Sequence, residues 1–334
     1  MSKKVIIVGL GSIGRRHLKN LKMMSPEMEI AVLRQHHQDK DLGELNDLVS
    51  EVFFETQEAL NWKPNVAFIT NPAPFHVETA LSFARENIHL FIEKPLSDTL
   101  EGIDSLLDEC QKRNLVVMLG YVLRFFGPLK IAKEALDKGC IGRLLSIRAT
   151  AGQYLPNWRP NTDYRKNVSA RKDLGGGIVF ELSHEIDYLR WLGGEIQQVQ
   201  ACLGKISDFD IDVEDVAEMS FRFTNGAIGH IHLDMVDHAR NRDCRIVGTE
   251  GTLVIDVIDK PSVRLFCGKK NQWIDLKSSE EIDRNEMFVN QFKHFFECVK
   301  ESKTPVCDGR EGRRIVEIVL AAKRSSQTGE VMKL

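Results

Sequence analysis

The chain has 334 residues, which is long for a single hydrophobic core and favours two domains. Hydrophobic residues make up 43% and charged residues 28%, and the net charge of −3 provides no general attraction to nucleic acid or to an anionic membrane surface. The seven cysteines are scattered and form no C-x-x-C pair, which argues against a disulfide framework and a zinc site and favours a reducing cytoplasm, with small molecules as partners.

The first third of the chain alternates short β-branched runs with helical stretches. The runs predict strands at 5–9, 29–33, 66–70 and 89–93, and the stretches between them predict helices at 15–24, 76–87 and 100–114. Such alternation is typical of a doubly wound parallel sheet, so residues 1–120 are expected to form a Rossmann domain in an α/β protein. No apolar run is long enough for a secretory signal or a membrane span, and neither is expected.

The pattern changes after about residue 120. A helix at 128–139 is followed by longer strands with apolar residues at every second position. The clearest pair spans 217–223 and 227–235, where Asn225-Gly226 supplies the positive-φ residues of a hairpin turn. Residues 121–334 are therefore expected to form a substrate-binding and oligomerisation domain of α+β type with a large, mostly antiparallel sheet.

A glycine-rich turn opens the chain. Gly9-x-Gly11-x-x-Gly14 follows a predicted strand and begins a predicted helix, the context in which glycines allow close backbone approach to a pyrophosphate. The amide groups of Ser12 and Ile13 belong to the same helix N-terminus. The alternative is a purely structural glycine turn, but the strand–turn–helix context favours a dinucleotide site.

Arg34 stands where an NAD enzyme usually has an acid for the ribose 2′-hydroxyl. An arginine at a strand end can bind a 2′-phosphate through charge-assisted hydrogen bonds, so NADP is favoured over NAD. NAD binding beside a solvated arginine stays open as the alternative.

Lys94 ends a predicted apolar strand in the sequence E-K-P. Ligands of open α/β sheets bind beyond the carboxyl ends of the strands, so the Lys94 ammonium is placed to polarise a substrate oxygen. The alternative is a surface ion pair between Lys94 and Glu93, which contributes little.

His184 lies on a predicted helix over 177–192, after the glycines at 175–177. Ile178, Leu182, Ile186 and Leu189 share one face, and the opposite face carries His184 together with Phe180, Glu181, Asp187, Tyr188 and Trp191. A pocket wall is favoured over a solvated face or a core histidine. Asp187, or alternatively Glu181, can orient the imidazole as a general acid/base needs. The glycines are interpreted as allowing a helix N-terminus to approach a ligand.

Five motifs occur in the order found in one known family. They are the glycine turn, T-N-P-A-P-F-H at 70–76, E-K-P at 93–95, G-Y-V-L-R-F-F-G-P-L at 120–129, and the glycines, histidine and aspartate over 175–187. Over essentially its whole length the chain resembles the glucose-fructose oxidoreductase/inositol dehydrogenase (Gfo/Idh/MocA) family. The resemblance implies NAD(P)-dependent oxidation or reduction of a sugar, cyclitol or related polyol carbon, with Lys94 and His184 flanking the reacting hydroxyl.

The expected site residues form three groups. The catalytic residues are Lys94, His184 and Asp187. The cofactor-binding residues are Gly9, Gly11, Ser12, Ile13, Gly14, Arg34, Thr70, Asn71, Pro72, His76, Glu93 and Lys94. The substrate-binding residues are Arg124, Trp158, Arg159, Tyr164, Arg165, Glu181 and Asp234. Two departures from the family pattern indicate a subgroup with its own substrate: the acid Glu181 is one residue closer to the histidine than usual, and Val122 replaces the usual asparagine.

A basic stretch over 153–173 precedes the glycines. It contains Arg159, Arg165, Lys166, Arg171 and Lys172 with Trp158 and Tyr164, a composition that suits an anionic sugar or a nucleotide-sugar. A solvated loop, or one that contacts a partner subunit, is an equal alternative. His230, His232 and Asp234 share one strand face, but a metal site is not expected there.

Two further functions compete with the dehydrogenase. One is a redox-neutral NAD-dependent glycosidase in which the cofactor is oxidised and reduced within one turnover, and the other is a catalytically idle NAD(P)-binding sensor. The family resemblance also implies a homodimer or homotetramer.

Overall fold

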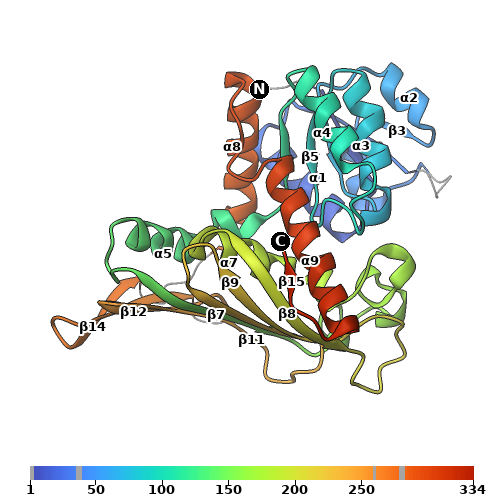
Figure 1. Cartoon of the computed structure of the whole chain (residues 1–334). Helices are drawn as coiled ribbons and strands as arrows, with labels where there is room; N and C mark the ends of the chain where they lie inside the picture. Colours follow the sequence, from blue (N-terminus) through green and yellow to red (C-terminus); the bar gives the residue numbers. More distant parts are fainter. Residues whose placement is uncertain (1–3, 35–39, 259–260, 278–282) are drawn as a thin grey trace. The chain divides into compact units, whose positions relative to one another are not determined.

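A computed structural model describes residues 4–34, 40–258, 261–277 and 283–334 (Figure 1). The contacts divide the chain into two units, Met1–Val122 with Asn285–Val316, and Leu123–Arg284 with Glu317–Leu334. This differs from the expected division into 1–120 and 121–334 because a late segment, 285–316, packs with the first unit.

The first unit contains a six-stranded parallel sheet in the order β3-β2-β1-β4-β5-β6. The strands are β1 Lys4–Val8, β2 Glu29–Leu33, β3 Glu51–Phe53, β4 Val66–Ile69, β5 His89–Ile92 and β6 Val117–Leu119. The predicted doubly wound fold is confirmed, and the two edge strands β3 and β6 are additions. Their short length, three residues each, explains why the sequence pattern did not reveal them.

Helices form two layers around this sheet. The unit contains α1 Ser12–Met24, α2 Thr56–Asn61, α3 His76–Arg85, α4 Ile103–Lys112 and α8 Glu286–Glu301. Helix α3 packs beside α4, and α1 packs beside α8 (Figure 1). The inner strands are buried between two helix layers, which explains why they are continuous apolar runs rather than alternating ones.

Helix α8 joins the first unit through phenylalanines. The Phe292 ring lies edge-on to Phe68 and Phe91, with centroids 5.3 and 5.5 Å apart, and Phe295 contacts the same two rings. The amides of Asn20 and Asn285 exchange hydrogen bonds of 3.1 and 2.8 Å between α1 and the start of α8. Residues 285–316 therefore complete the apolar core around the six-stranded sheet.

The second unit contains a nine-stranded sheet in the order β14-β13-β12-β11-β7-β10-β9-β8-β15. The strands are β7 Leu144–Gly152, β8 Ile196–Gly204, β9 Val216–Phe223, β10 Ile228–Asp234, β11 Asn241–Gly248, β12 Gly251–Asp256, β13 Ser262–Cys267, β14 Gln272–Lys277 and β15 Met332–Lys333. Every described pairing is antiparallel except β7 with β10. The predicted mostly antiparallel sheet is confirmed.

The predicted hairpin joins β9 and β10. Its loop covers 224–226, closed by a 3.0 Å hydrogen bond from the Phe223 amide to the Ala227 carbonyl. Within this loop only Gly226 has a positive φ, of 85°, whereas the expected turn required one at Asn225 as well. The Asn225 side chain instead accepts a hydrogen bond from the Ala227 amide at 3.0 Å, which stabilises a three-residue loop.

One face of this sheet is covered by helices α5 Gly127–Asp137, α6 Ile178–Glu181 and α7 Ser183–Gly193. The predicted helix over 177–192 is interrupted at Leu182, where φ is −100° and ψ is 29°. Helix α9, Gly309–Thr328, contributes residues to both units. None of the helices in the described ranges combines the length and apolar composition needed to cross a bilayer.

Candidate active site

The glycine turn between β1 and α1 is tightly packed against the end of β4. A Cβ on Gly9, whose φ is +90°, would lie 2.8 Å from the Asn71 backbone nitrogen. A Cβ on Gly14 would lie 2.3 Å from the Gly9 carbonyl oxygen. Gly11 has open space around it and is exposed. Two of the glycines therefore allow the tight turn, and the third leaves room above it.

The N-terminus of α1 is available to an anion. Within the described residues no side chain caps this helix, and its first turn contains no acid. The first helical hydrogen bond runs from the Arg15 amide to the Gly11 carbonyl, so the amides of Ser12, Ile13 and Gly14 precede the helical ladder. Unbonded amides and the positive end of a helix dipole are the groups that bind a pyrophosphate, so these residues fit an NAD(P) cofactor.

Thr70 and Asn71 follow β4, as expected for cofactor-binding residues, but their side chains contact protein atoms. The Thr70 hydroxyl lies 2.9 Å from the Val8 carbonyl and 2.6 Å from the Gly9 carbonyl. The Asn71 amide donates to the Thr79 hydroxyl at 3.0 Å. Both side chains hold the glycine turn and its neighbouring loop in shape.

His76, at the start of α3, is buried between two backbone carbonyls. Its Nδ1 lies 2.9 Å from the Pro95 oxygen and its Nε2 lies 2.6 Å from the Asn71 oxygen. Burial lowers the pKa of His76 below its ordinary value, although the two carbonyl contacts act in the opposite direction. The expected cofactor-binding role of His76 and of neighbouring Pro72 stays a prediction, and the geometry favours an indirect role for His76.

Arg34 directly follows β2, the position that the sequence indicated for recognition of the adenosine ribose. It is half-buried, and its backbone amide donates to the Phe53 carbonyl at 2.9 Å. The residues after it, 35–39, lie outside the described residues.

Lys94 follows β5, with Glu93 before it and a cis peptide bond to Pro95 after it. Glu93 is not part of a surface ion pair. It is only 8% exposed, and its carboxylate lies 2.6 Å from Nε2 of His17, a fully buried residue on α1. Lys94 itself is half-buried, and its backbone amide donates to the Glu93 carboxylate at 3.2 Å.

His184 lies in the first turn of α7 and is half-buried, and two fully buried acids, Glu185 and Asp187, follow it in the same helix. Asp187 accepts from Arg124 at 2.7, 3.0 and 3.1 Å, and both side chains are buried. Glu185 accepts from Arg242 at 2.6 and 2.9 Å. The structure thus pairs Asp187 with Arg124. Asp187 was expected to orient the imidazole of His184, and Arg124 was expected to bind the substrate. That Asp187 or half-buried Glu181 orients His184 stays a prediction.

The glycines before this helix are closely surrounded by protein atoms. A Cβ on Gly176 would lie 2.3 Å from the Val168 carbonyl oxygen. A Cβ on Gly177, whose φ is +108°, would lie 2.5 Å from a carboxylate oxygen of Glu214. Protein atoms account for both glycines, and the expected approach of the helix N-terminus to a ligand stays a prediction.

The basic stretch over 153–173 forms short turns, and two of its three arginines are paired with acids. Arg165 pairs with Asp163 at 2.9 Å and lies 3.8 Å from Asp210. Arg171 pairs with Asp173 at 2.5 Å. Arg159 and Lys166 form no ion pair with any described residue. Trp158 and Tyr164 are half-buried: the indole donates to the Gln153 carbonyl at 2.8 Å, and the Tyr164 hydroxyl accepts from the Asp210 amide at 3.4 Å.

Asp234, expected to reach a substrate, is buried at the end of β10. It accepts from the amides of Val236 and Asp237 at 2.8 and 2.6 Å, so it holds the following turn. His232 lies between Glu218 and Asp234, at 2.6 and 3.1 Å. Partial burial opposes its charge, but these two acids raise the pKa of His232 above its ordinary value. No group of His, Cys, Asp or Glu side chains in the described ranges has the arrangement of a metal site.

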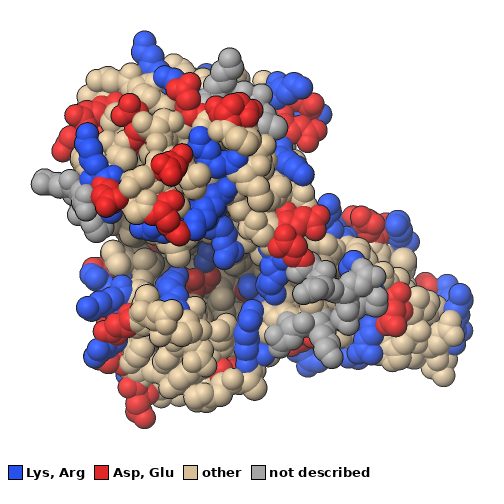
Figure 2. Space-filling model, turned by 180° about the vertical axis from the view of Figure 1, so that it is seen from behind, with Lys and Arg blue, Asp and Glu red and all other residues tan. Residues whose placement is uncertain are grey.

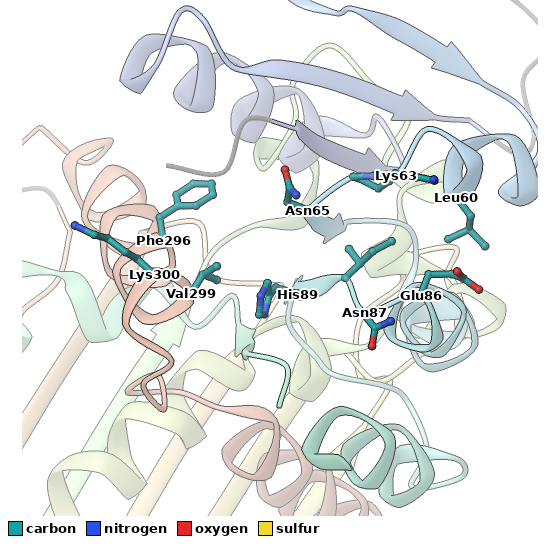
Figure 3. Close-up of a pocket in the computed structure, with 11 residues that line it drawn as sticks. Leu60, Lys63, Asn65, Glu86, Asn87, His89, Phe296, Val299 and Lys300 are labelled. Carbon is teal, nitrogen blue, oxygen red and sulfur yellow. The ribbon is translucent and has the colours of Figure 1, made fainter. Parts of the chain in front are cut away.

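Figure 3 shows a pocket of about 800 Å³ in the first unit. Phe296, Val299 and Lys300 reach it from α8, and Asn65 and His89 lie at the amino ends of β4 and β5. The glycine turn and Lys94 lie at the carboxyl ends of the strands, so this pocket is separate from the residues expected to bind the cofactor. Charged side chains of both signs are interspersed over the face in Figure 2, in keeping with the small net charge.

Comparisons with known proteins identify the family. Residues 3–121 match the oxidoreductase family with an NAD-binding Rossmann fold, and residues 129–254 match the GFO/IDH/MocA C-terminal domain. The chain belongs to the GFO/IDH/MocA family. It is therefore an NAD(P)-dependent oxidoreductase with an NAD-binding Rossmann fold, as the resemblance implied.

Relatives of this family match the chain over nearly its full length. A myo-inositol 2-dehydrogenase from Thermotoga maritima is 26% identical, covering 99% of this chain and 98% of that protein. The structure of a levoglucosan dehydrogenase with NADH and levoglucosan has a TM-score of 0.86 at 22% identity, over 99% and 98% of the two chains. The WlbA dehydrogenase from Bordetella pertussis, in complex with NADH and UDP-GlcNAcA, has a TM-score of 0.83 at 20% identity, over 100% and 99%.

Sequence reasoning missed His17, Glu185 and Arg242 as structural partners of the site. His17 follows the glycine turn closely, but its partner Glu93 is distant in the sequence. Glu185 is adjacent to His184 in the sequence. An acid next to a candidate catalytic residue, in a helix with an apolar face, was the signal that could have indicated a buried ion pair.

Proposed function

We propose that the chain transfers a hydride between NAD(P) and a hydroxyl or keto carbon of a sugar or cyclitol. The observation that carries the proposal is the glycine turn, where Gly9 and Gly14 leave no room for a side chain in front of the uncapped N-terminus of α1. The bound nicotinamide supplies the hydride acceptor or donor. Names of relatives, an inositol and a levoglucosan dehydrogenase, support a substrate rich in hydroxyl groups.

Lys94 and His184 have distinct tasks in this reaction. The Lys94 ammonium donates hydrogen bonds to the reacting oxygen and stabilises the negative charge that develops on it. His184 accepts the hydroxyl proton when the substrate is oxidised and returns it when the substrate is reduced. The proton and the hydride thus leave the substrate in separate directions.

Two substitutions test these roles. His184→Ala and Lys94→Met should each lower kcat by about 10² to 10⁴ while the affinity for NADH changes little. His230→Ala, at a partly exposed histidine on the second-unit sheet, is the matched control and should leave kcat unchanged. Near-normal turnover of His184→Ala would remove His184 from the mechanism. Cofactor binding without turnover on any sugar would favour a sensor.

Arg34 supports a preference for NADP. Its place after β2 suits a charge-assisted hydrogen bond to the 2′-phosphate, which contributes about 1.5 to 3 kcal/mol. NADPH should therefore bind at least about tenfold more tightly than NADH, and Arg34→Ala should remove the difference. Equal or tighter binding of NADH by the unchanged chain would contradict the preference.

An anionic sugar or nucleotide-sugar is the finer proposal for the substrate. It depends on Arg159 and Lys166, because Arg165 and Arg171 nearby are already matched by acids. Thermal-shift measurements with NADPH or NADH present would compare myo-inositol, levoglucosan, glucuronate and UDP-GlcNAcA. Stabilisation by the anionic compounds, weakened in Arg159→Ala, is expected. Stabilisation by the neutral compounds alone would contradict the anionic substrate and leave the dehydrogenase proposal intact.

Release of free reduced cofactor separates oxidation from redox-neutral glycosidase chemistry. A dehydrogenase releases one reduced cofactor for each substrate oxidised, and absorbance at the nicotinamide band measures it directly. Product formation without net reduced cofactor would support the redox-neutral reaction.

The assembly state is the last part of the proposal. The face of the nine-stranded sheet opposite α5, α6 and α7 carries half-buried and exposed side chains, Trp273 and Ile228 among them. A homodimer or homotetramer that covers this face is expected by light scattering after gel filtration, and a monomer at micromolar concentration would contradict it.

A further inference from the structure

Two buried histidines hold the residues on either side of Lys94. His17 contacts the Glu93 carboxylate at 2.6 Å, and His76 contacts the Pro95 carbonyl at 2.9 Å. We propose that His17 is a positioning residue for Lys94, acting through Glu93. The proposal rests on the proposed function, in which Lys94 touches the reacting oxygen.

The connection from His17 to Lys94 has only two steps. Nε2 of His17 meets one oxygen of the Glu93 carboxylate, and the other oxygen accepts the backbone amide of Lys94 at 3.2 Å. His17 is fully buried and Glu93 nearly so, which strengthens both hydrogen bonds relative to an exposed pair. The carboxylate orientation, and with it the Lys94 backbone, is therefore set by the ring of His17.

The surroundings of His17 show that packing alone does not explain a histidine there. The ring lies edge-on to Phe292 and Phe91, with centroids 4.9 and 5.6 Å apart, and near Phe68 at 5.9 Å. Among the described residues its Nδ1 has no hydrogen-bond partner. A buried, unsatisfied nitrogen in an aromatic cage is unfavourable, so the hydrogen bond to Glu93 is what offsets it.

The Glu93 carboxylate has little freedom to move elsewhere. A Cβ on Gly120, after β6, would lie 2.8 to 2.9 Å from the carboxylate atoms, so the sheet backbone borders it on that side. His17, Gly120 and the Lys94 amide thus confine the carboxylate from three directions. Loss of the His17 bond would release one of these three constraints.

The arrangement also links the cofactor to the lysine. Helix α1 offers its N-terminus to the pyrophosphate and carries His17 on the same rigid element. The helix that binds the cofactor therefore also sets the loop from which Lys94 approaches the substrate.

The test is a double-mutant cycle between His17 and Lys94. His17→Phe keeps a ring in the cage but removes the donor, and His17→Gln keeps a donor. With the best substrate of the four-compound panel, His17→Phe should lower kcat by up to about 10², with NADH affinity within about threefold, and His17→Gln should recover most of kcat. In the Lys94→Met background, His17→Phe should have no further effect on kcat.

The outcomes separate the two proposals. Unchanged kcat in Lys94→Met alone would overturn the role of Lys94 in the proposed function, and the positioning role of His17 with it. If His17→Phe lowers kcat by the same factor in the Lys94→Met background as in the unchanged chain, only the positioning role is overturned. A general structural defect would lower kcat in both backgrounds.

A second measurement needs no substrate. Reductive ¹³C-methylation labels the lysines, and Lys94→Arg assigns the Lys94 signal in the NMR spectrum. That signal should move in His17→Phe and stay near its original position in His17→Gln. A Lys94 signal that is the same in His17→Phe as in the unchanged chain would overturn the proposal. If His17→Phe does not fold, comparing His17→Gln with Glu93→Gln provides the same test, because a neutral amide at position 93 no longer accepts charge-assisted hydrogen bonds.

Discussion

The two units hold their candidate catalytic side chains by different physical means. In the first unit, Lys94 follows Glu93, whose partner His17 is enclosed by phenylalanine rings. In the second unit, His184 is followed on α7 by Glu185 and Asp187, each a fully buried acid paired with an arginine. One site is supported mainly by apolar packing and the other mainly by buried charge.

The difference predicts different sensitivities. Apolar packing stabilises the native state directly, so the first unit should respond to lost volume. A buried ion pair contributes little net stability, but removing one partner leaves an uncompensated charge. The second unit should therefore respond to changes of charge, and a change that removes both partners should be tolerated better than a change that removes one.

Arg124→Leu should have the largest effect, a loss of about 3 to 5 kcal/mol in the free energy of unfolding, because Asp187 would stay buried without its partner. Urea unfolding followed by tryptophan fluorescence and circular dichroism measures it. Arg124→Leu with Asp187→Leu should recover most of the loss. Arg165→Leu, which breaks an exposed pair with Asp163, is the control and should change stability by less than about 1 kcal/mol. Equal losses of stability in Arg124→Leu and Arg165→Leu would contradict the importance of buried charge in the second unit.

Phe292→Ala should lower the free energy of unfolding by about 3 kcal/mol, because it opens a cavity among Phe68, Phe91 and His17. The loss should be the same at low and high salt concentration, since no charge is involved. Phe75→Ala, at a position 41% exposed, is the control in the same unit. A loss below about 1 kcal/mol for Phe292→Ala would show that α8 is not essential to this core.

Gly177→Ala should lower the free energy of unfolding by about 1 to 3 kcal/mol, because alanine adopts a φ of 108° poorly and its Cβ would lie 2.5 Å from Glu214. Gly127→Ala, at a helix start with no atoms within 4 Å of the added Cβ, should be nearly neutral. Calorimetry compares the two. If Gly177→Ala lowered substrate affinity without lowering stability, the result would support the interpretation that the glycines face a ligand.

His232 should give the smallest effect, a pH dependence of thermal stability. Burial alone would lower its pKa, but Glu218 and Asp234 outweigh burial and raise the pKa in the folded state. The contribution of His232 to the free energy of unfolding is therefore complete at a pH below its pKa in the unfolded chain, about 6.5. This contribution is lost as the pH rises through the raised pKa of the folded state. Since the side chain is partly exposed, the contribution should stay below about 1 kcal/mol, or about 2 to 4 °C in Tm. His232→Gln should flatten this pH dependence, and an unchanged slope would assign it to other groups.

Local pattern was enough to predict the frame of the fold. The four buried strands β1, β2, β4 and β5 are apolar runs with turn signals on both sides, and the Gly9 and Gly14 contacts follow from the strand–turn–helix context. Apolar and polar residues alternate along the strands of the second unit because one face of the sheet is covered by helices. The position of Lys94 at a strand end and the helical setting of His184 were predictable for the same reason, but the start of a separate helix just before His184 was not.

Partners far apart in sequence were not predictable. Arg124 and Asp187 are separated by 63 positions, and His17 and Glu93 by 76. Each residue taken alone has several plausible roles, and only the folded chain shows which of them meet. The break at Leu182 was hidden for a related reason, since the same apolar spacing fits one helix or two short ones.

The return of residues 285–316 to the first unit has a consequence for attempts to isolate or transplant it. A fragment ending near residue 120 would lack α8 and would expose Phe68 and Phe91, which Phe292 and Phe295 cover in the intact chain. Such a fragment would be prone to aggregate. The nucleotide-binding module of this protein is therefore discontinuous, and a chimaera with a foreign substrate domain has to insert that domain between residues 122 and 285 rather than append it at the end.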